Sequence, residues 1–388
     1  MLARIVVFFA LLTATTQATV QLGIDVLTEQ NFAPLEGKRV GLVTNQTGVN
    51  SSGTKTRVIL KKNTNLVALY SPEHGLDGTI GAGKYVASRT DKATGVIVHS
   101  LYGPTRKPTA AMLKGVDVLV FDMQDIGVRS YTYVSTMAKC MEACGELGVE
   151  FMVLDRPNPL GGDRIEGPGI ESKWISFVGQ LPVPYIHGMT IGELAQMANA
   201  KGWAGAPCKL TVIPMRGWTR TMNWEQTGLR WVQTSPNIPR ASSVVGYAAT
   251  SIFGSLSGAG FDVGIGTGFP FEMCGFAGAS ASVLSAFLAE GGIPCGAGGE
   301  SGVRLNVNAA SKVNLAAINV YLLSAAQKMK KGGIFGRYKD GDNIFWKIYG
   351  STNIRSQIEK GMSPKAIVAA WESVASSFRG ARQSFLLY

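Results

Sequence analysis

The chain has 388 residues, 46% of them hydrophobic, which is long enough and apolar enough for two folded domains and excludes a disordered protein. Five cysteines form an odd and sparse set, which argues against a fold held together by disulfides. Lys and Arg outnumber Asp and Glu by 37 to 26, for a net charge of +11. The basic residues are scattered and not interleaved with aromatic ones, so we expect an anionic polymer or a carboxylate-bearing substrate as partner, and no nucleic acid.

The first 18 residues have the pattern of a secretory signal peptide. Arg4 precedes an apolar stretch from Ile5 to Leu12, and small residues continue to Ala18, where we expect cleavage. No later stretch reaches the roughly 18 apolar residues that a membrane span needs. We therefore expect an exported protein, periplasmic or secreted, with no membrane span after cleavage.

From residue 37 to residue 155, short apolar runs alternate with helical patterns. The runs at 38–44, 65–71, 117–123 and 149–155 are rich in Val, Leu and Phe, which is typical of strands covered on both faces. The segments at 54–62, 109–115 and 131–148 between them favour helices. This alternation predicts an α/β fold with a parallel, doubly wound sheet.

Polar side chains follow each of these four runs. Open α/β sheets bind ligands at the carboxyl ends of their strands, so we expect a ligand-binding rim there. Along the chain, the residues that follow the four runs are Asn45 and Gln46; Glu73 and His74; Asp122, Gln124, Asp125 and Arg129; and Asp155, Arg156 and Asn158.

Two glycine-rich stretches do not predict nucleotide sites. Residues 78–84 have the spacing of a P-loop, but Tyr85 stands where a Ser or Thr would hold magnesium. Residues 260–269 follow no clear strand, and we expect a tight loop. No G-x-S-x-G motif is present, so the nucleophile of the usual α/β serine hydrolases is missing.

Beyond Pro159 the sequence becomes rich in loops and then predicts a second unit. Thr190 and Glu193 form a capping box that begins a helix at residues 190–200. Four tryptophans lie between residues 203 and 231, and we expect at most one or two of them to contact a ligand. From about residue 300 the pattern is α+β, with a strand at 302–308, a helix at 316–331 and a closing helix at 363–388.

An ordered series of motifs carries a family resemblance, among them "GLVTNQTGV", "SPEHG", "DVLVFDMQDIGVRSYTY", "DRPNPLGG", "PYIHGMTIGELA" and the terminal "FLLY". These motifs resemble the NamZ-type exo-β-N-acetylmuramidase family, from about Gly23 to Tyr388. The resemblance implies a Rossmann-like domain at 23–255, a smaller C-terminal α+β domain at 256–388 and a cleft between them. It also implies release of β-1,4-linked N-acetylmuramic acid from the non-reducing ends of peptidoglycan fragments, without a cofactor.

Two positions depart from the family pattern. Lys84 stands where many relatives have a glutamate, and Ile265 stands where many have an arginine. Both positions bear on substrate preference more than on the fold or the reaction class.

Glycoside hydrolysis needs an acid for the leaving oxygen and a second group at the anomeric carbon. Glu73 is the candidate acid, because a carboxyl group at an apolar sheet rim is partly withdrawn from water. His74 can orient it, orient the sugar or supply a proton. Glu166 and Asp125 are equal candidates for the second group, unless the sugar's acetamido oxygen attacks and a carboxylate only orients it.

The lactyl carboxylate of muramic acid requires a cation, and an arginine fork matches a carboxylate best. Arg129 and Arg156 both follow strand ends, although either could instead form a salt bridge to an aspartate. For the sugar hydroxyls and the acetamide, the candidate residues on the same rim are Asn45, Gln46, Asp155 and Asn158.

Two other classes of function remain open. A metal hydrolase could use His74, Asp77 and Asp122, but the chain has three histidines and no repeated ligand spacing, so we expect no metal. A non-catalytic wall-glycan-binding protein would need the cleft without needing Glu73.

Overall fold

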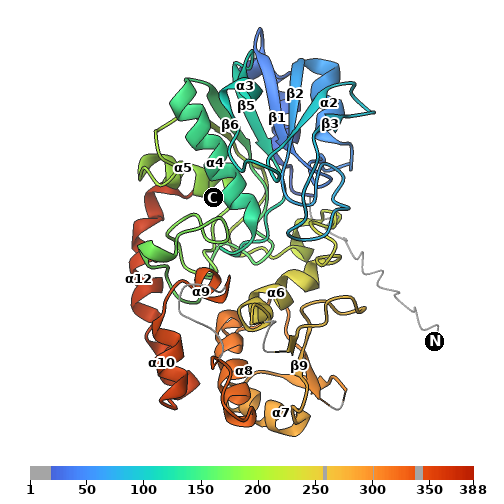
Figure 1. Ribbon diagram of the computed structural model, residues 1–388. Helices are drawn as coiled ribbons and strands as arrows, with labels where there is room; N and C mark the ends of the chain where they lie inside the picture. The colour runs from blue at the N-terminus through green and yellow to red at the C-terminus, as the bar shows by residue number, and fades with distance from the viewer. Residues whose placement is uncertain (1–18, 257–259, 300, 337–343) are drawn as a thin grey trace, which may run out of the picture.

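A computed structural model describes residues 19–256, 260–299, 301–336 and 344–388 (Figure 1). The predicted signal peptide lies outside the described residues. The first part of the chain forms a seven-stranded sheet in which all neighbouring strands are parallel except β3 and β4. Its strands, in spatial order, are β3 (Arg89–Thr90), β4 (Ile97–Ser100), β2 (Asn65–Ser71), β1 (Arg39–Thr44), β5 (Val118–Asp122), β6 (Glu150–Leu154) and β7 (Leu210–Ile213). The four predicted strands are adjacent, as β2, β1, β5 and β6, which confirms the parallel sheet.

Helices cover both faces of this sheet because successive strand residues point to opposite sides. Phe121 packs in one hydrophobic cluster with residues of α4 (Thr132–Leu147) and α5 (Ile191–Ala200). Its neighbour Val120 packs in a second cluster with residues of α1 (Gly23–Glu29) and α2 (Thr56–Asn63). The sheet is therefore doubly wound, as predicted. A one-turn helix, α3 (Ala110–Leu113), precedes β5, and the predicted capping box of Thr190 and Glu193 begins α5.

A smaller unit follows, built on a four-stranded antiparallel sheet. The helices of this unit are α6 (Ala241–Gly254), α7 (Ala281–Glu290) and α8 (Leu315–Met329), and its strands, in spatial order, are β10 (Cys295–Ala297), β11 (Gly302–Leu305), β9 (Met273–Phe276) and β8 (Phe261–Asp262). The strand and helix predicted from residue 300 onward are β11 and α8. The domain boundary at residue 255 falls directly after α6 and remains a prediction.

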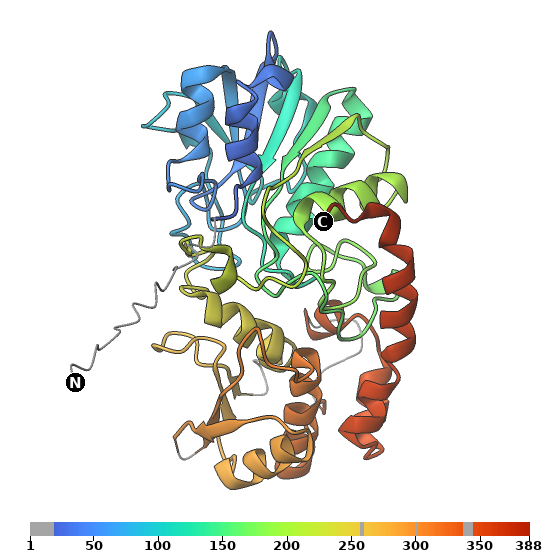
Figure 2. The same ribbon diagram turned by 180° about the vertical axis from the view of Figure 1, so that it is seen from behind.

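The last part of the chain returns from the smaller unit to the first sheet (Figure 2). It contains α9 (Ile344–Tyr349), α10 (Asn353–Glu359), α11 (Pro364–Ala369) and α12 (Glu372–Ala381). The prediction of one helix over 363–388 is wrong, because the helix is interrupted at Ala370 and Trp371 and α12 ends at Ala381. The residues beyond α12 bend back, so that the Leu387 N–H reaches Glu193 and the Tyr388 hydroxyl reaches Asp155.

Short 3₁₀ segments occur at Ala33–Leu35, Ser172–Trp174, Glu225–Thr227 and Gln383–Phe385. All five cysteines carry free thiols. Within the described ranges, no helix combines the length and the hydrophobicity that crossing a membrane requires.

Candidate active site

The turn after β2 presents Glu73 and His74 in a constrained backbone. His74 has φ of 69° and Gly75 has φ of 77°, and a left-handed conformation at a non-glycine residue costs about 1–3 kcal/mol. The His74 Nδ1 lies 2.7 Å from the carbonyl oxygen of Ile80. A carbonyl oxygen only accepts, so Nδ1 carries a proton, and in the neutral ring Nε2 keeps its lone pair.

Glu73 is buried and bound on both carboxyl oxygens. Its Oε1 accepts a hydrogen bond from the Gly83 N–H at 2.7 Å, and its Oε2 accepts one from the Thr132 hydroxyl at 2.7 Å. Thr132 is the first residue of α4. The positive end of that helix dipole therefore faces Glu73, which favours a negative charge at this position.

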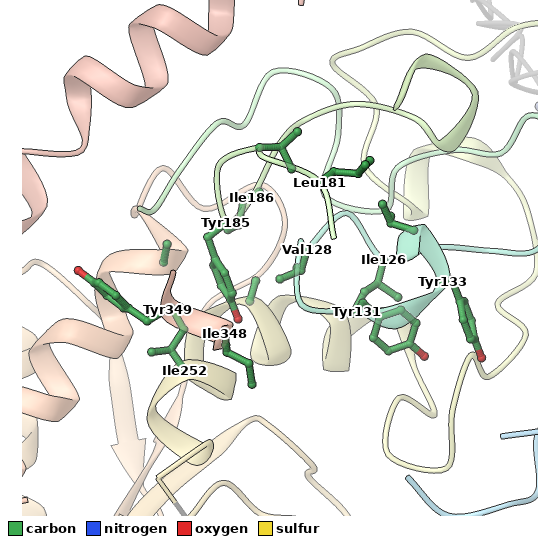
Figure 3. Close-up of a cluster of buried hydrophobic side chains, with 14 of the residues drawn as sticks. Ile126, Val128, Tyr131, Tyr133, Leu181, Tyr185, Ile186, Ile252, Ile348 and Tyr349 are labelled. Atoms are coloured by element: carbon green, nitrogen blue, oxygen red, sulfur yellow. The ribbon is translucent and has the colours of Figure 1, made fainter. Parts of the chain in front are cut away.

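Two tyrosines that precede and begin α4 border the same place. The Tyr131 and Tyr133 rings meet edge to face with centroids 4.9 Å apart, and Figure 3 shows them side by side at one end of a hydrophobic cluster. The Tyr131 hydroxyl donates to Thr234 Oγ1 at 2.9 Å and the Tyr133 hydroxyl to the Thr234 carbonyl at 2.6 Å. Burial, followed by the charges of Tyr131, Glu73 and Asp125, raises the pKa of Tyr133. Both carboxyl groups therefore lie within electrostatic range of one ring.

Asp125 follows β5 and is also buried, but it is bound differently from Glu73. Its Oδ2 accepts from the Gly127 N–H at 2.8 Å, while Oδ1 has no hydrogen-bond partner in the described part of the chain. Burial raises the pKa of Asp125 to about 7. Asp125 can therefore hold a proton near neutral pH, whereas both oxygens of Glu73 act as acceptors.

Glu166, the other candidate for the second catalytic group, holds the start of α8. It forms an ion pair with Arg164 and accepts hydrogen bonds from the backbone N–H of Leu315 at 2.6 Å and of Ala316 at 3.4 Å. Among the described residues it shares no hydrogen-bond partner with Glu73 or Asp125. Both carboxyl groups remain candidates for the second catalytic group, and Asp125 is the one that, together with Glu73, contributes to the raised pKa of Tyr133.

The two arginines predicted to receive a carboxylate are already engaged. Arg156 forms a buried ion pair with Asp122, with N–O distances of 2.6 and 2.9 Å, which is the alternative left open by the sequence. Arg129 is 2% exposed. Its guanidinium donates at 2.7–3.0 Å to the carbonyl oxygens of Pro168, Val183, Ile348 and Tyr349. In the structure the Arg129 guanidinium joins three segments of backbone, and a substrate-binding role for it stays a prediction.

Asp155 and Asn158 also serve the local structure. Asp155 accepts hydrogen bonds from Thr190 Oγ1 at 2.8 Å, from the Gly192 N–H at 2.8 Å and from the Tyr388 hydroxyl at 2.7 Å. Asn158 accepts from the Leu160 N–H and donates to the Met189 carbonyl, both at 3.0 Å. Both side chains therefore have partners within the protein, and a substrate-binding role for either stays a prediction.

Asn45 and Gln46 lie at the end of β1, on the side of the tyrosine pair. Gln46 donates to the carbonyl oxygens of Gln233 at 2.8 Å and Thr234 at 3.0 Å, and Thr234 is the residue that binds Tyr131 and Tyr133. Asn45 accepts from Thr47, while its own Nδ2 is buried without a partner in the described residues. A substrate-binding role for these two amides remains a prediction.

A cavity of about 260 Å³ lies at the same rim but excludes Glu73 and His74 from its lining. Trp224 and Trp231 line it, in edge-to-face contact with ring centroids 4.8 Å apart. Gln124 and Arg156 line it as well. This cavity is therefore separate from the turn that carries the candidate acid.

Sequence reasoning missed Tyr102 and Arg106, which follow β4. The Arg106 guanidinium stacks on the Tyr102 ring, 3.7 Å from its centroid. Burial, followed by the Glu73 carboxylate, raises the pKa of Tyr102 to about 12, so Tyr102 lies beside Glu73. Recognising residues 97–100 as a strand would have placed both residues at the rim, by the reasoning that placed Glu73 there.

Of the three ligands suggested for a metal hydrolase, the two aspartates are bound to arginines. Asp77 pairs with Arg57 at 3.1 Å and also with Arg89, and Asp122 pairs with Arg156. Within the described ranges, no three His, Cys, Asp or Glu side chains gather as a metal site would require.

Comparison with known proteins agrees with this arrangement. Residues 40–242 match the family described as exo-beta-N-acetylmuramidase NamZ, N-terminal, and residues 298–388 match its C-terminal counterpart. The chain is 40% identical to the peptidoglycan beta-N-acetylmuramidase NamZ of Bacillus subtilis (strain 168), over 95% of this chain and 91% of that protein.

Two crystal structures of DUF1343 family proteins from Bacteroides fragilis NCTC 9343 resemble the fold. One has a TM-score of 0.84 and 39% identity, and covers 95% of this chain and 99% of its own. The other has a TM-score of 0.74 and 30% identity, and covers 96% and 99%. The similarity spans both sheets and nearly the whole described chain, and the protein belongs to the NamZ exo-β-N-acetylmuramidase family.

Proposed function

We propose that the protein is an exo-acting glycoside hydrolase that releases β-1,4-linked N-acetylmuramic acid from the non-reducing ends of peptidoglycan fragments. The similarity to a named peptidoglycan muramidase over 95% of the chain is the observation that carries this proposal. The buried carboxyl groups of Glu73 and Asp125, both near Tyr133, support it, because glycosidases commonly use two carboxyl groups.

The structure supports a particular division of the proton chemistry. Asp125, whose pKa is raised to about 7 and whose buried Oδ1 has no hydrogen-bond partner among the described residues, is the group to which we assign protonation of the leaving oxygen at neutral pH. Glu73, facing the start of α4 and accepting two hydrogen bonds, can stabilise positive charge at the anomeric carbon or orient an attacking acetamido oxygen. The sequence alone favoured Glu73 as the acid, and one experiment distinguishes the two assignments.

That experiment compares Glu73→Gln and Asp125→Asn on aryl β-N-acetylmuraminides with good and poor leaving groups. Each variant is expected to lose about 10²- to 10⁴-fold in kcat on the poor leaving group. The acid variant alone should recover much of its loss in the glycosidic cleavage step when the leaving group departs without protonation. Glu290→Gln, an exposed carboxyl change on α7, is the control. Near wild-type rates for both site variants on all substrates would contradict the proposal.

The same variants separate a hydrolase from a binding protein. A non-catalytic wall-glycan-binding protein would retain affinity in Glu73→Gln and would have no turnover to lose. Binding with no muraminide hydrolysis by the unmodified protein would therefore favour the binding protein.

We also propose export to the periplasm or the medium, on the basis of Arg4, the apolar run and Ala18. The mature chain should begin near Thr19. N-terminal sequencing of protein recovered from the envelope or medium tests this, and an intact first residue would contradict it.

A further inference from the structure

The carboxylate of muramic acid needs a cation, and the two expected arginines do not supply one freely. Arg129 donates hydrogen bonds to four backbone carbonyl oxygens, and Arg156 forms an ion pair with Asp122. A carboxylate that enters a site without a partner loses its hydration at a cost of several kcal/mol. The substrate class of the proposed function therefore requires a different basic residue near Glu73.

Arg106 is held rigidly but is not neutralised. Its guanidinium lies 3.7 Å from the centroid of the Tyr102 ring and 5.5 Å from that of Phe177. One nitrogen, Nη1, donates to the Gly103 carbonyl at 3.0 Å. Within the described chain Arg106 forms no ion pair, and its side chain is only partly buried. Aromatic contacts fix the plane of a guanidinium while they leave N–H groups at its edge for a ligand.

The next residue, Lys107, is a basic side chain that is neutralised by ion pairs. Lys107 binds Glu142 at 3.0 Å and Glu146 at 2.8 Å on α4. Lys107 is therefore occupied by carboxylates of the protein itself, whereas Arg106 is not. The pair offers a natural comparison of two adjacent basic residues.

Arg106 is also connected to the candidate catalytic carboxyl group through one aromatic ring. Tyr102 contacts the guanidinium on its face, and the N–H of the preceding residue, Leu101, donates to the Ser71 carbonyl at 2.8 Å, at the end of the strand that leads to Glu73. A sugar whose anomeric carbon lies near Glu73 would thus carry its 3-O substituent within reach of a cation on the same wall of the site.

We propose that Arg106 binds the lactyl carboxylate of the muramic acid residue and so determines the preference for muramic acid over N-acetylglucosamine. This inference rests on the proposed function. An arginine that pairs with this group is left unpaired by the glucosamine analogue, which is a strong source of discrimination. The competing role, in which Arg106 only balances the charge of Glu73, predicts equal losses on every substrate.

The test is a cycle of two changes, one in the protein and one in the substrate. The kcat/KM of the unmodified protein and of Arg106→Ala is measured on an aryl β-N-acetylmuraminide, on the same compound with its lactyl carboxylate converted to the amide, and on the β-N-acetylglucosaminide. We expect Arg106→Ala to lower the muraminide value by about 10²-fold, mainly through KM, and to change the other two values by less than about threefold. Arg106→Lys should recover only part of the loss, because it keeps the charge but not the fork.

Lys107→Ala is the matched control and should leave the ratio between the substrates unchanged. Equal losses on all three substrates with Arg106→Ala would overturn the inference, because they indicate a structural role or a role toward Glu73. Unchanged kinetics would also overturn it, while the hydrolase assignment would stand. If the unmodified protein hydrolyses none of the substrates, the proposed function fails, and this inference fails with it.

Discussion

Asp125 and Glu73 lie near the same tyrosine ring, yet they are bound differently: Glu73 accepts a hydrogen bond on each carboxyl oxygen, whereas Asp125 accepts one on Oδ2 alone. Asp125, with its pKa raised to about 7 by burial, should be mostly protonated below pH 7 and mostly ionised above it. If it is the general acid, kcat on poor leaving groups should fall about tenfold per pH unit above pH 7. The pH profile of the unmodified protein tests this, with Asp125→Asn expected to lack this decrease. A rate that stays level to pH 9 would contradict the assignment.

The same carboxyl group should leave a signature in stability. Its pKa is higher in the folded protein than the ordinary 3.8, so the folded state binds the proton more tightly. The resulting stabilisation is complete below about pH 4 and is lost as pH rises to about 7. Urea unfolding of the unmodified protein and of Asp125→Asn should therefore diverge over this range by up to about 4 kcal/mol, in favour of the variant at higher pH. The same dependence of the free energy of unfolding on pH in both proteins would contradict this prediction. Asp155, whose pKa is also raised, is present in both proteins.

At the residue scale, the sequence predicted where polar side chains lie better than it predicted what they bind. The rule that polar groups follow strand ends brought Glu73, Asp125 and Gln46 to one side of the sheet. It could not show that Arg129 binds backbone, because its acceptors Val183, in a loop, and Tyr349, at the end of α9, are 54 and 220 positions away in the sequence. It also could not distinguish Glu166 as a helix-start ligand, since α8 begins about 150 residues later.

At the scale of elements, Arg129 joins the loop at 168–183 to the end of α9. Replacing it with Met preserves most of its volume but leaves the carbonyl oxygens of Val183, Ile348 and Tyr349 without a donor among the described residues, while the Pro168 carbonyl still accepts from the Tyr185 N–H. Because each unpaired buried group costs about 1–3 kcal/mol, we expect a loss of at least about 3 kcal/mol in the free energy of unfolding. Urea denaturation measures this, with Arg379→Met on exposed α12 as the control. Equal midpoints for the two variants would show that the four contacts do not stabilise the fold.

Elements with a strong period were predicted well, and short or interrupted ones were not. The buried strands β1, β2, β5 and β6 and the long helix α4 fall within one or two residues of their predicted bounds. The strands β4 and β7 have four residues each, too few to show a clear pattern. The segment after α12 contacts Glu193 and Asp155, which are far away in the sequence, so no local pattern predicts the interruption between α11 and α12.

At the scale of the molecule, the chain end is anchored in the first sheet. The Tyr388 hydroxyl donates to Asp155 and accepts from the Met215 N–H at 2.8 Å, while its ring meets Trp218 edge to face. Tyr388→Phe keeps the ring and removes both hydrogen bonds, so it should lower the free energy of unfolding by about 1.5–3 kcal/mol. Thermal or urea unfolding tests this against Tyr85→Phe, whose side chain is 65% exposed. A loss no larger than that of the control would contradict the anchoring role.

This anchor also bears on how the polypeptide acquires its structure during synthesis. Asp155 and its partner Tyr388 lie 233 positions apart in the chain. A nascent chain can assemble its parallel strands before Tyr388 is synthesised, so one of the hydrogen-bond donors to this buried aspartate arrives late. Pairing over such a separation slows folding, because a long loop must close before the contact forms. A tag fused after Tyr388 would extend the chain directly from this anchor.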